Sequence, residues 1–372
     1  MEKVETLIVG GGIAGLSTAW HLARCGRKGI LLVEKERFLG TQSSGRNAAI
    51  LRTVGPDPLT TSLGQRSAHL MGNPPDGFTP VPLIDPCGLL LLGDAEHGDT
   101  LASWVEAAGP DSGGREISIQ QLRQEAPFYR GEAKRIFSFP EEGRIDIAAL
   151  MAGFAGGARS AGAVIRNGVA VSHLNRLGAR VTGVRLTDGT DLEAEVTILA
   201  AGGWAGQLGA EAGSRVVLRP TRRHLMVTAP HPGIDSAWPV LWALGDDFYC
   251  RPESGGMLLC ACDQTEVEPG DCRRDDEVCE VIASKTARLL PDFGDVQAAR
   301  FWCGLRTLTR DDRFAIGYDP DVESLFWVAG LGGHGMVCSF EIGRLAARRV
   351  MAEEEMAADE KALDPARLVA VT

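Results

Sequence analysis

The first forty residues alternate between short apolar runs and one amphipathic segment. Residues 6–9 form an apolar run with the length of a strand, and residues 29–33 form another. Between them, residues 13–25 carry apolar side chains at helical spacing, and Gly26 is placed to end the helix. The inner side of this helix would consist of Leu16, Ala19, Trp20, Leu22 and Ala23. The pattern predicts a strand, a helix and a second strand, which together form a βαβ unit.

Strand-like patterning returns in three later segments. Residues 164–199 contain apolar segments between Gly and Asp-Gly turns, which is typical of antiparallel strands. Residues 325–329 form an apolar run that leads through four glycines into a predicted helix, Met336–Met351. The apolar run before Arg306 predicts a buried strand that ends at this cation. Because strands and helices are mixed along the chain, we expect an α/β fold.

The turn inside the first βαβ unit has the spacing G-x-G-x-x-G, formed by Gly10, Gly12 and Gly15. Gly10 permits a tight turn, Gly12 lets a pyrophosphate approach the backbone, and Gly15 lets helix and strand pack closely. Glu34 follows the second apolar run, where a carboxylate can bind ribose hydroxyls and disfavours the 2′-phosphate of NADP. The segment predicts a dinucleotide site, and the fingerprint alone leaves FAD and NAD open.

Composition and charge narrow the class of protein. A chain of 372 residues favours about two domains. The formal net charge of −11 argues against nucleic acid as a partner. The first apolar run is only a strand long, and no apolar stretch reaches the about 18 residues of a membrane span. We therefore expect no signal peptide, no integral membrane segment and a cytoplasmic location.

The cysteines predict neither a disulfide framework nor a metal site. There are nine of them with scattered spacing, which favours reduced thiols. Cys260, Cys262 and Cys272 lie near one another in the sequence but match no zinc-ligand pattern, and no His follows at a useful distance. Buried thiols in or after a strand are the favoured reading of these residues, so we expect no bound metal.

Three later segments of the sequence favour FAD over NAD and resemble a known family. S-S-G-R-N-A-A at 43–49, T-I-L-A-A-G-G-W at 197–204 and the glycine-rich 325–337 all suit close approach of a cofactor. In this order with G-G-G-I-A-G, they make the whole chain resemble the D-amino-acid oxidase-like (DAO) family of FAD-dependent amine oxidoreductases. Within it, the D-arginine dehydrogenases are most similar, through the segments 73–78, 222–227, 246–252 and 304–307.

The resemblance implies a division into two interleaved domains. A Rossmann-like FAD-binding domain of the glutathione-reductase type would comprise residues 1–80, 145–218 and 301–372. An α+β substrate-binding domain built on an antiparallel sheet would comprise residues 81–144 and 219–300. Within the first domain, the last twenty or so residues, which follow the final predicted helix, are expected to form a peripheral tail.

The resemblance also implies which residues bind FAD. Backbone N–H groups at the start of the last helix would stabilise the negative charge of a reduced flavin. We expect non-covalent FAD, because Cys303 lies one residue from the position at which sarcosine oxidase-like members attach it. The predicted FAD-binding residues are Gly10, Gly12, Ala14, Gly15, Glu34, Lys35, Ser43, Ser44, Gly45, Arg46, Asn47, Ala48, Ala49, Ile50, Val171, Gly202, Gly332, Gly333, His334, Gly335, Met336 and Val337.

A small carboxylate substrate is predicted from Arg223, Tyr249 and Arg306, which the resemblance brings together above the flavin. Neighbours on a strand point to opposite faces, and the alignment makes Arg223 rather than Arg222 the inward one. Two guanidinium groups and a phenol suit an α-carboxylate, since an Arg fork binds it bidentately. Next to the flavin, His334 either assists at the substrate or bonds only locally.

Each of these residues also has a structural interpretation. Arg306 could pair with Asp311 or Asp312 in its own loop, Arg223 could lie on a sheet surface, and Tyr249 could be an interface aromatic. Only the family resemblance raises the functional interpretation above these alternatives.

Departures from the D-arginine dehydrogenases bear on the substrate side chain. Leu89 stands where those enzymes carry a carboxylate that binds the substrate's cation, so a cationic side chain is disfavoured. Ile50, Leu51 and Arg52 replace polar residues of the flavin-facing loop. They favour a neutral or hydrophobic side chain, while Arg52 leaves an acidic one as the rival. Arg52 and Gly333 complete the predicted substrate-binding residues.

The predicted reaction is oxidative deamination of an amino acid, with a D-amino acid favoured. Hydride passes from Cα to flavin N5, and water converts the imino acid into a 2-oxo acid and ammonia. Tyr249 and His334 are the candidates to assist. Rival readings are oxidation of an N-substituted amino acid, oxidation of a 2-hydroxy acid, and a flavin- or NAD-binding protein without turnover.

The oxidant of the reduced flavin is predicted to be oxygen or a quinone or dye. Asp263 stands near the position at which sarcosine oxidase-like members carry an oxygen-activating Lys, which tilts the prediction toward a dehydrogenase. The sequence leaves the chirality of the substrate and the oligomeric state open.

Overall fold

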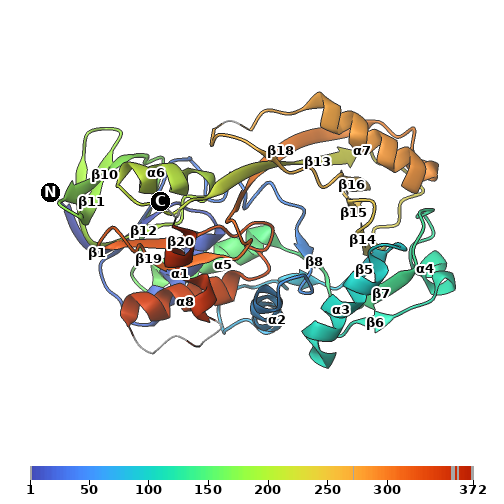
Figure 1. The fold of residues 1–372 in the computed structure, drawn as a ribbon, viewed down its shortest axis with the longest axis horizontal. Helices are drawn as coiled ribbons and strands as arrows, with labels where there is room; N and C mark the ends of the chain where they lie inside the picture. The colour runs from blue at the N-terminus through green and yellow to red at the C-terminus, as the bar shows by residue number, and fades with distance from the viewer. Residues whose placement is uncertain (1, 271, 353–356, 358–359, 370–372) are drawn as a thin grey trace.

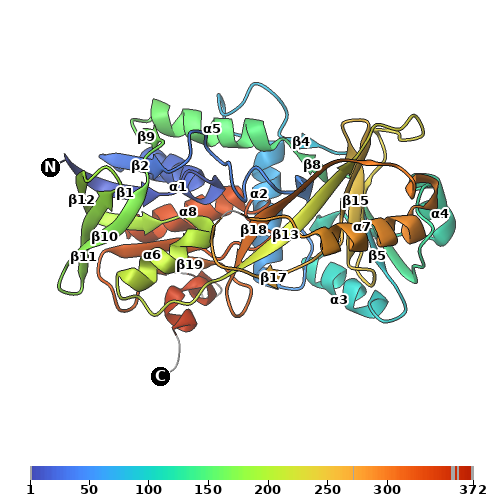
Figure 2. The same cartoon turned by 90° about the horizontal axis from the view of Figure 1, so that it is seen from above.

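Two sheet-based parts lie side by side in the computed structural model, which describes residues 2–270, 272–352, 357 and 360–369 (Figure 1). One part contains the N-terminal strand and the last long helix. The strands of the other part lie within two segments of the chain, residues 89–139 and residues 219–308. The long strands β13 (Arg219–Thr228) and β18 (Ala298–Leu308) run between the two parts, as Figures 1 and 2 both show.

An eight-stranded mixed sheet forms the first part. Its centre is parallel, with β12 next to β1, β1 next to β2, β2 next to β9, and β20 on the other side of β12. Antiparallel strands β10, β11 and β19 extend it. The strands are β1 Glu2–Val9, β2 Ile30–Glu34, β9 Val164–Asn167, β10 Val171–Leu177, β11 Arg180–Leu186, β12 Asp191–Leu199, β19 Ala315–Tyr318 and β20 Leu325–Ala329.

The second part is a nine-stranded sheet that is antiparallel except where β14 pairs with β5. Its order is β17-β13-β16-β15-β14-β5-β7-β6, and β18 pairs with the other side of β13. Besides β13 and β18, the strands are β5 Leu89–Gly93, β6 Arg115–Glu116, β7 Arg135–Phe139, β14 Val240–Ala243, β15 Phe248–Glu253, β16 Gly256–Cys260 and β17 Thr265–Glu266. A small three-stranded sheet has the order β3 Ile50–Leu51, β8 Gly143–Ile145, β4 Ile84–Asp85.

Helices cover both large sheets. The apolar cluster on one face of the eight-stranded sheet combines residues of α1, α2, α5 and α8, and the cluster on its other face includes residues of α6. A third cluster packs α4 and α7 against the nine-stranded sheet. The helices are α1 Ile13–Arg24, α2 Pro58–Gly72, α3 Gly98–Ala108, α4 Ile119–Glu125, α5 Ile147–Ser160, α6 Ala205–Glu211, α7 Asp276–Leu289 and α8 Ser339–Met351.

The predicted α/β fold is confirmed, and the predicted βαβ unit is present as β1, α1 and β2. Two details differ. Strand β1 starts at Glu2 rather than near residue 6, because its first residues pair with β12 from Leu192 onward. The last helix begins at Ser339, three residues later than Met336, because the preceding glycine-rich segment forms turns.

The predicted domain bounds stay a prediction, but two of their details can be set against the strands. Residue 301, the predicted start of the last FAD-domain segment, falls inside β18, which pairs with β13 throughout and so lies in the nine-stranded sheet. In the predicted tail, Leu363 and Leu368 are buried, and residue 369 bridges to Val216. The rest of that tail, residues 353–356, 358–359 and 370–372, lies outside the described residues.

Helices α1 and α8 cross so closely that the contact requires a glycine. A Cβ at Gly343 would overlap the Ser17 Oγ atom and lie 2.5 Å from the Ser17 carbonyl oxygen. The Ser17 hydroxyl donates a hydrogen bond of 2.5 Å to the Ser339 carbonyl at the start of α8. Because α1 follows the glycine-rich turn and α8 follows the second glycine-rich segment, this crossing sets the distance between the two.

We expect Gly343→Ala to destabilise the protein by about 1–3 kcal/mol, since the added methyl group must push apart two packed helices. Gly156→Ala is the matched control, because a Cβ at this exposed position of α5 meets nothing within 4 Å. Replacing an exposed helical glycine by alanine should leave stability unchanged or raise it by about 0.5–1 kcal/mol. Denaturant unfolding measures both changes; equal stability of the two variants would contradict the close crossing.

Candidate functional site

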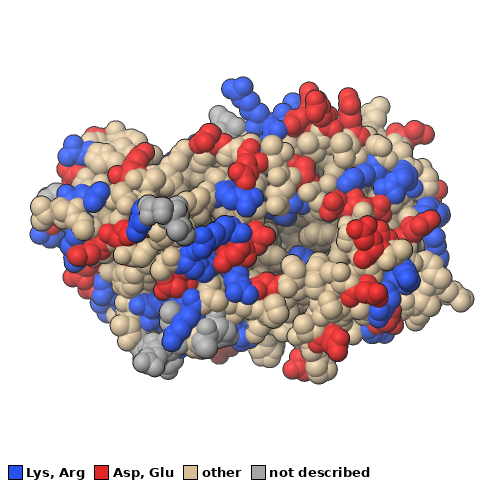
Figure 3. All heavy atoms as spheres, viewed as in Figure 1, with Lys and Arg blue, Asp and Glu red and all other residues tan. Residues whose placement is uncertain are grey.

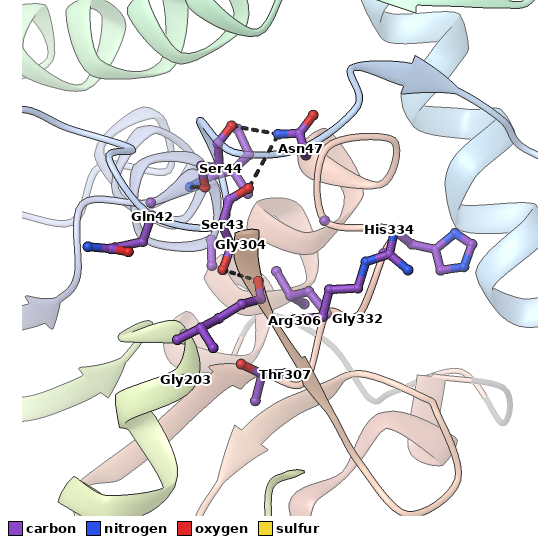
Figure 4. A pocket seen from close by; sticks show the side chains of 18 of the residues that line it. Gln42, Ser43, Ser44, Asn47, Gly203, Gly304, Arg306, Thr307, Gly332 and His334 are labelled. Carbon is purple, nitrogen blue, oxygen red and sulfur yellow. Dashed lines mark hydrogen bonds between the residues drawn. The ribbon is translucent and has the colours of Figure 1, made fainter. Parts of the chain in front are cut away.

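A single elongated cavity of about 870 Å³ lies at the carboxyl ends of the parallel strands and continues to the nine-stranded sheet. The turns after β1, β2, β12 and β20 all border it. In an open parallel sheet this edge is where ligands bind. Figure 3 shows a hollow near the middle of one face, with acidic and basic side chains mixed around it. Figure 4 shows the part of the cavity where the two sheets meet.

The glycine-rich turn between β1 and α1 is shaped by backbone contacts. Gly10 has a φ of +114°, and a Cβ there would overlap the Ala200 carbonyl oxygen. A Cβ at Gly15 would overlap the Gly10 carbonyl oxygen. Both positions therefore require glycine. Gly12, like Gly10, borders the cavity, and its missing side chain leaves the backbone open to a ligand.

The start of α1 suits a diphosphate. No acidic residue lies in its first turn, and the N-cap residue Gly12 offers no side chain to the free N–H groups. Among those groups, Ile13 N–H donates to the Ser44 hydroxyl at 3.0 Å, and Ile13 and Ala14 border the cavity. The helix dipole and the unpaired N–H groups therefore favour an anion at this point.

Glu34 ends β2 and is held at the cavity by two backbone groups. Its Oε2 accepts a 2.6 Å hydrogen bond from Gly11 N–H, and its Oε1 accepts a 2.9 Å bond from Glu36 N–H. The side chain is buried yet borders the cavity, as a carboxylate that binds ribose must. Lys35 also borders the cavity, with its Nζ atom 3.3 Å from the ring centroid of Trp204.

The loop of residues 43–50 is held by its own polar side chains. The Asn47 amide donates to the carbonyls of Ser44 at 2.6 Å and Ser43 at 3.4 Å, as Figure 4 shows, and accepts from Ala49 N–H at 2.7 Å. The Ser43 hydroxyl donates to the Leu305 carbonyl at 2.6 Å, which ties the loop to β18. This loop can therefore line a cofactor without rearranging.

The second glycine-rich segment closes the cavity from the other side. Gly330 and Gly332 adopt left-handed φ values of +69° and +51°. Gly332 N–H donates to the Thr307 carbonyl at 2.9 Å, which fixes the segment against β18. The N–H groups near the predicted flavin thus lie in turns and not in the first turn of a helix, which corrects the predicted source of the dipole.

Nearly all of the predicted site residues border the cavity. The two exceptions are Gly15 and Gly45. Gly15 packs α1 against β1, and a Cβ at Gly45 would lie 2.6 Å from the Gly40 carbonyl oxygen. Their small size serves the packing of the chain around the cavity and gives no surface to a ligand.

Arg223, Tyr249 and Arg306 meet at the end of the cavity formed by the nine-stranded sheet. Arg223 and Tyr249 are buried, with exposed fractions of 7% and 1%, whereas Arg306 is half-buried. Gly333 leaves room for Arg306, since a Cβ there would lie 3.2 Å from the guanidinium carbon. Figure 4 shows the Arg306 side chain extending toward His334.

The electrostatics of this cluster favour an anion. Burial, and then the charge of Arg223, lower the pKa of Arg306, yet a guanidinium stays protonated at physiological pH. Burial raises the pKa of Tyr249 well above its ordinary value, so the phenol keeps its proton and can donate it. Burial, and then the charges of Arg52 and Arg306, lower the pKa of His334 to about 3, so its imidazole is neutral.

Within the described residues, Arg306 forms no ion pair with either of its alternative partners, Asp311 and Asp312. Asp311 pairs with Arg367 at 2.8 Å. Arg222, on the other face of β13, pairs with Asp275 at 2.6 Å. Arg223 donates to the Gln264 side chain at 3.1 Å, and its buried Nε has no partner. Within the described residues, neither Arg223 nor Arg306 forms an ion pair with a carboxylate.

Not all of the residues that were predicted to determine the preferred side chain of the substrate border the cavity. Leu89 is fully buried in β5 among apolar residues and does not border the cavity, so the prediction based on it is wrong. Ile50 and Arg52 do border the cavity, while Leu51 between them is buried in the core. The alternation follows from the extended backbone, whose successive side chains point to opposite sides.

Several cavity residues were not predicted from the sequence, among them three close to Arg223 and Tyr249. Trp242 packs against Tyr249 with the ring planes tilted by 44° and the centroids 4.6 Å apart, because these residues are register partners in β14 and β15. Gln264 binds Arg223, and Cys262 borders the cavity next to it. The hairpin pattern L-W-A-L-G-D-D-F-Y is the signal that could have placed Trp242 opposite Tyr249.

A disulfide joins Cys272 and Cys303, so the prediction that all cysteines are reduced is wrong for this pair. Their Cα atoms lie 5.9 Å apart although 31 positions separate them in the sequence. The pairing depends on the tertiary path of the segment after β17 past β18, which the scattered spacing does not reveal. Cys303 does not border the cavity, whereas its neighbour Gly304 does.

Among the residues that the structure describes, no helix combines the length and the apolar character needed to cross a membrane.

Comparison with known proteins gives one consistent family. The model described as "FAD dependent oxidoreductase" (DAO) matches residues 5–349. The 4-methylaminobutanoate oxidase (formaldehyde-forming) of Paenarthrobacter nicotinovorans is 27% identical over 367 residues, which are 94% of this chain and 44% of that protein. The chain therefore spans less than half of this relative's length. The glycine oxidase of Geobacillus kaustophilus is 27% identical over 369 residues, covering 95% of this chain and 94% of that protein.

The fold has a solved counterpart as well. The crystal structure of L-proline dehydrogenase from P. horikoshii superposes with a TM-score of 0.88, covers 98% of both chains and is 22% identical. At this identity the likeness concerns the fold.

We expect seven thiols to react with Ellman's reagent in denatured, unreduced protein, because two of the nine cysteines are in the disulfide. Reduction before the assay should raise the number to nine. Cys303→Ser is the control: it removes one cysteine of the nine and frees its partner Cys272, so eight thiols should react without reduction. Nine reactive thiols in the unreduced wild type would show that the pair is not bonded.

Proposed function

We propose that this chain, which belongs to the DAO family of FAD-dependent oxidoreductases, oxidises an amino acid whose α-carboxylate binds Arg223 and Arg306. Family membership makes FAD the cofactor and the oxidation of amines or amino acids the class of reaction. The proposal adds the orientation of the substrate, a primary amine as the reacting group, and a 2-oxo acid and ammonia as the products.

The observation that carries the proposal is the pair of guanidinium groups without a carboxylate partner. Arg223 and Arg306 border the same cavity, and burial makes an uncompensated cation costly there. A carboxylate that bridges them would remove this cost, and the neutral phenol of Tyr249 can donate a further hydrogen bond. An α-carboxylate is the one anionic group that every amino acid carries.

The residues of the chain would position the substrate for oxidation. FAD, when bound, supplies the acceptor of the hydride at its N5 atom. Binding the carboxylate at Arg223 and Arg306 holds Cα at the junction of the two sheets, where residues 43–50 and 332–337 line the cavity. The Cα–H bond breaks with its electron pair, the nitrogen loses a proton, and a C=N bond forms. Water then hydrolyses the imino acid to the 2-oxo acid and ammonia.

We propose that the FAD is non-covalent. Cys303, the cysteine nearest to the family's attachment position, is bonded to Cys272 and has no free thiol. We also propose that the enzyme is a dehydrogenase, because the cavity offers no oxygen-activating lysine near the predicted flavin among the described residues. Lys35, at the dinucleotide end, is the one lysine among the described residues that border the cavity, and Asp263 is bound to His224 at 2.7 Å.

A secondary amino acid is the second candidate substrate. The name of the 4-methylaminobutanoate oxidase describes an N-methylated amino acid, and that relative matches 94% of this chain. The carboxylate site would be the same, and the oxidised nitrogen would carry a carbon substituent.

The test is anaerobic bleaching of the bound flavin by a panel of D- and L-amino acids, N-methyl amino acids and 2-hydroxy acids. Bleaching by primary amino acids with release of ammonia is expected. Bleaching only by N-methyl compounds would favour the second candidate, and bleaching only by hydroxy acids would overturn both. Purified protein without flavin absorbance would remove the basis of the proposal.

Arg306→Met should weaken amino-acid binding by about 30-fold or more, because truncating one member of a desolvated charge pair costs roughly 2–5 kcal/mol. The FAD content should not change. Arg310→Met is the control, since this exposed arginine of the same segment does not border the cavity. Titration of the flavin spectrum with a non-reacting carboxylate measures both affinities. An unchanged affinity in Arg306→Met would remove this residue from the site.

His334→Asn should leave the pH profile of the flavin-reduction rate in place between about pH 6 and 9. The pKa of His334 is depressed to about 3, so its imidazole gains a proton only far below this range and contributes no inflection within it. The absolute rate can fall, because a hydrogen-bonding group changes. An inflection near the ordinary pKa of histidine that disappears in the variant would contradict the neutral imidazole.

A further inference from the structure

We infer that the substrate carries a second carboxylate, separate from the α-carboxylate, and that Arg52 binds it. The inference rests on the proposed function, which accounts for Arg223 and Arg306 but leaves Arg52 without a role. It reverses the preference for a neutral side chain that the sequence suggested, since that preference depended in part on Leu89, which does not border the cavity.

Arg52 is positioned at the cavity by three neighbours. Its guanidinium carbon lies 4.3 Å from the ring centroid of Trp242, and its Nη1 donates to the Val54 carbonyl at 3.1 Å. Gly55 leaves space at the tip, since a Cβ there would lie 3.9 Å from both Arg52 Nη1 and His334 Cε1. The guanidinium is thus held beside the predicted flavin-facing His334, and its remaining N–H groups are available to a ligand.

No carboxylate of the described chain compensates this cation directly. Glu142 acts on it electrostatically, but Glu142 Oε1 accepts from the N–H and hydroxyl groups of Thr53 at 2.8 Å and 2.5 Å. Its Oε2 is buried without a partner, and burial raises the pKa of Glu142 to about 7. Glu142 itself does not border the cavity. The described acidic residues that do border it form no ion pair with Arg52; they are Glu34, Asp57, Glu211, Asp247 and Asp312.

Apart from Arg46, which is assigned to the cofactor, three guanidinium groups border the cavity, and none of the three forms an ion pair with a carboxylate of the described residues. Burial lowers the pKa of Arg52, the charge of Glu142 partly opposes this effect, and the nearby charge of Arg306 lowers the pKa further. A single carboxylate bound by Arg223 and Arg306 leaves the third cation uncompensated. A substrate with two carboxylates supplies one partner to the pair Arg223 and Arg306 and another to Arg52. The planar guanidinium of Arg52, which lies over Trp242, presents a fork of N–H groups that suits a carboxylate.

Trp242 also couples the two subsites. Its ring centroid lies 4.6 Å from that of Tyr249 and 4.3 Å from the guanidinium carbon of Arg52, so one indole contacts both a member of the α-carboxylate site and the second cation. The second carboxylate can belong to the side chain, as in aspartate or glutamate, or to a substituent on nitrogen, as in iminodiacetate. The chemistry recognised by Arg52 is the same in both cases.

The first arm of the test needs no variant and no turnover. The flavin spectrum of the wild-type holoenzyme is titrated with succinate and with butyrate, which have equal chain length and differ by one carboxylate. We expect succinate to bind at least about tenfold more tightly, because only succinate reaches both cationic sites. Equal affinities, or tighter binding of butyrate, would overturn the inference.

The second arm measures anaerobic flavin reduction by matched acids and neutral analogues. D- and L-aspartate and glutamate are compared with asparagine and glutamine, and iminodiacetate with N-methylglycine. Faster reduction at low concentration by an acid than by its analogue is expected, and the favoured pair tells whether the second carboxylate lies on carbon or on nitrogen. If the neutral compounds reduce the flavin equally well, the proposed function stands and the second carboxylate is wrong. If none reduces it, both fail.

The third arm uses Arg52→Met, with Arg310→Met as the control outside the cavity. Arg52→Met should lose the preference for succinate over butyrate while butyrate binding stays within about twofold, whereas Arg306→Met should weaken both ligands. Release of FAD from correctly folded Arg52→Met protein would assign Arg52 to the cofactor and overturn the inference, as would an unchanged preference for succinate. If Arg52→Met does not fold, Arg52→Lys, which keeps the charge but loses the fork, should reduce the preference only in part.

Discussion

The pairing of β13 with β18 is the constraint on which the candidate site depends. Their register places Thr221 opposite Arg306 and Gly304 opposite Arg223, so the two cations come from adjacent strands at neighbouring positions. Two like charges would separate if they were on mobile loops. Here the backbone hydrogen bonds of a long antiparallel pair hold them, and the same pair joins the two parts of the molecule (Figure 2).

Holding these buried cations without an ion-pair partner lowers the stability of the folded protein. Arg223 keeps one buried Nε without a partner, and within the described chain neither Arg306 nor Arg52 forms an ion pair with a carboxylate. The neutral neighbours do not remove these charges: Tyr249 stays protonated and His334 stays unprotonated. The site is thus preorganised for an anion at the expense of stability, as is common where a binding site must be ready before its ligand arrives.

The sequence predicted the local features well and the non-local ones poorly. The βαβ unit with its glycines could be predicted because turn geometry and helix periodicity depend on neighbouring residues. The convergence of Arg223, Tyr249 and Arg306 on one cavity was expected from the family resemblance and not from any local pattern. Leu89 was misplaced because β5 is buried among apolar residues on both faces, which the apolar run of residues 89–92 does not distinguish from a strand that lines a cavity.

The remaining misses have the same origin. Trp242 of β14 contacts Arg52, which directly follows β3 in another sheet, and Cys272 contacts Cys303 through the path of a loop past β18. The spacing of residues along the sequence predicts neither of these two contacts. The late start of α8 follows from left-handed glycines whose conformation depends on contacts with β18.

The joining of the first and last segments has a consequence for biosynthesis. The cavity is bordered by Val9 near the beginning of the chain and by Val337 near its end, and α8 covers the almost fully buried α1. At about 5–20 residues per second, the ribosome completes α8 on the order of tens of seconds after α1 has emerged. During that interval the apolar face of α1 lacks its cover and the dinucleotide crevice lacks a wall. Cofactor capture is therefore a late event in the life of the nascent chain, and any chain that stops before α8 presents an uncovered apolar helix to the quality-control machinery of the cell.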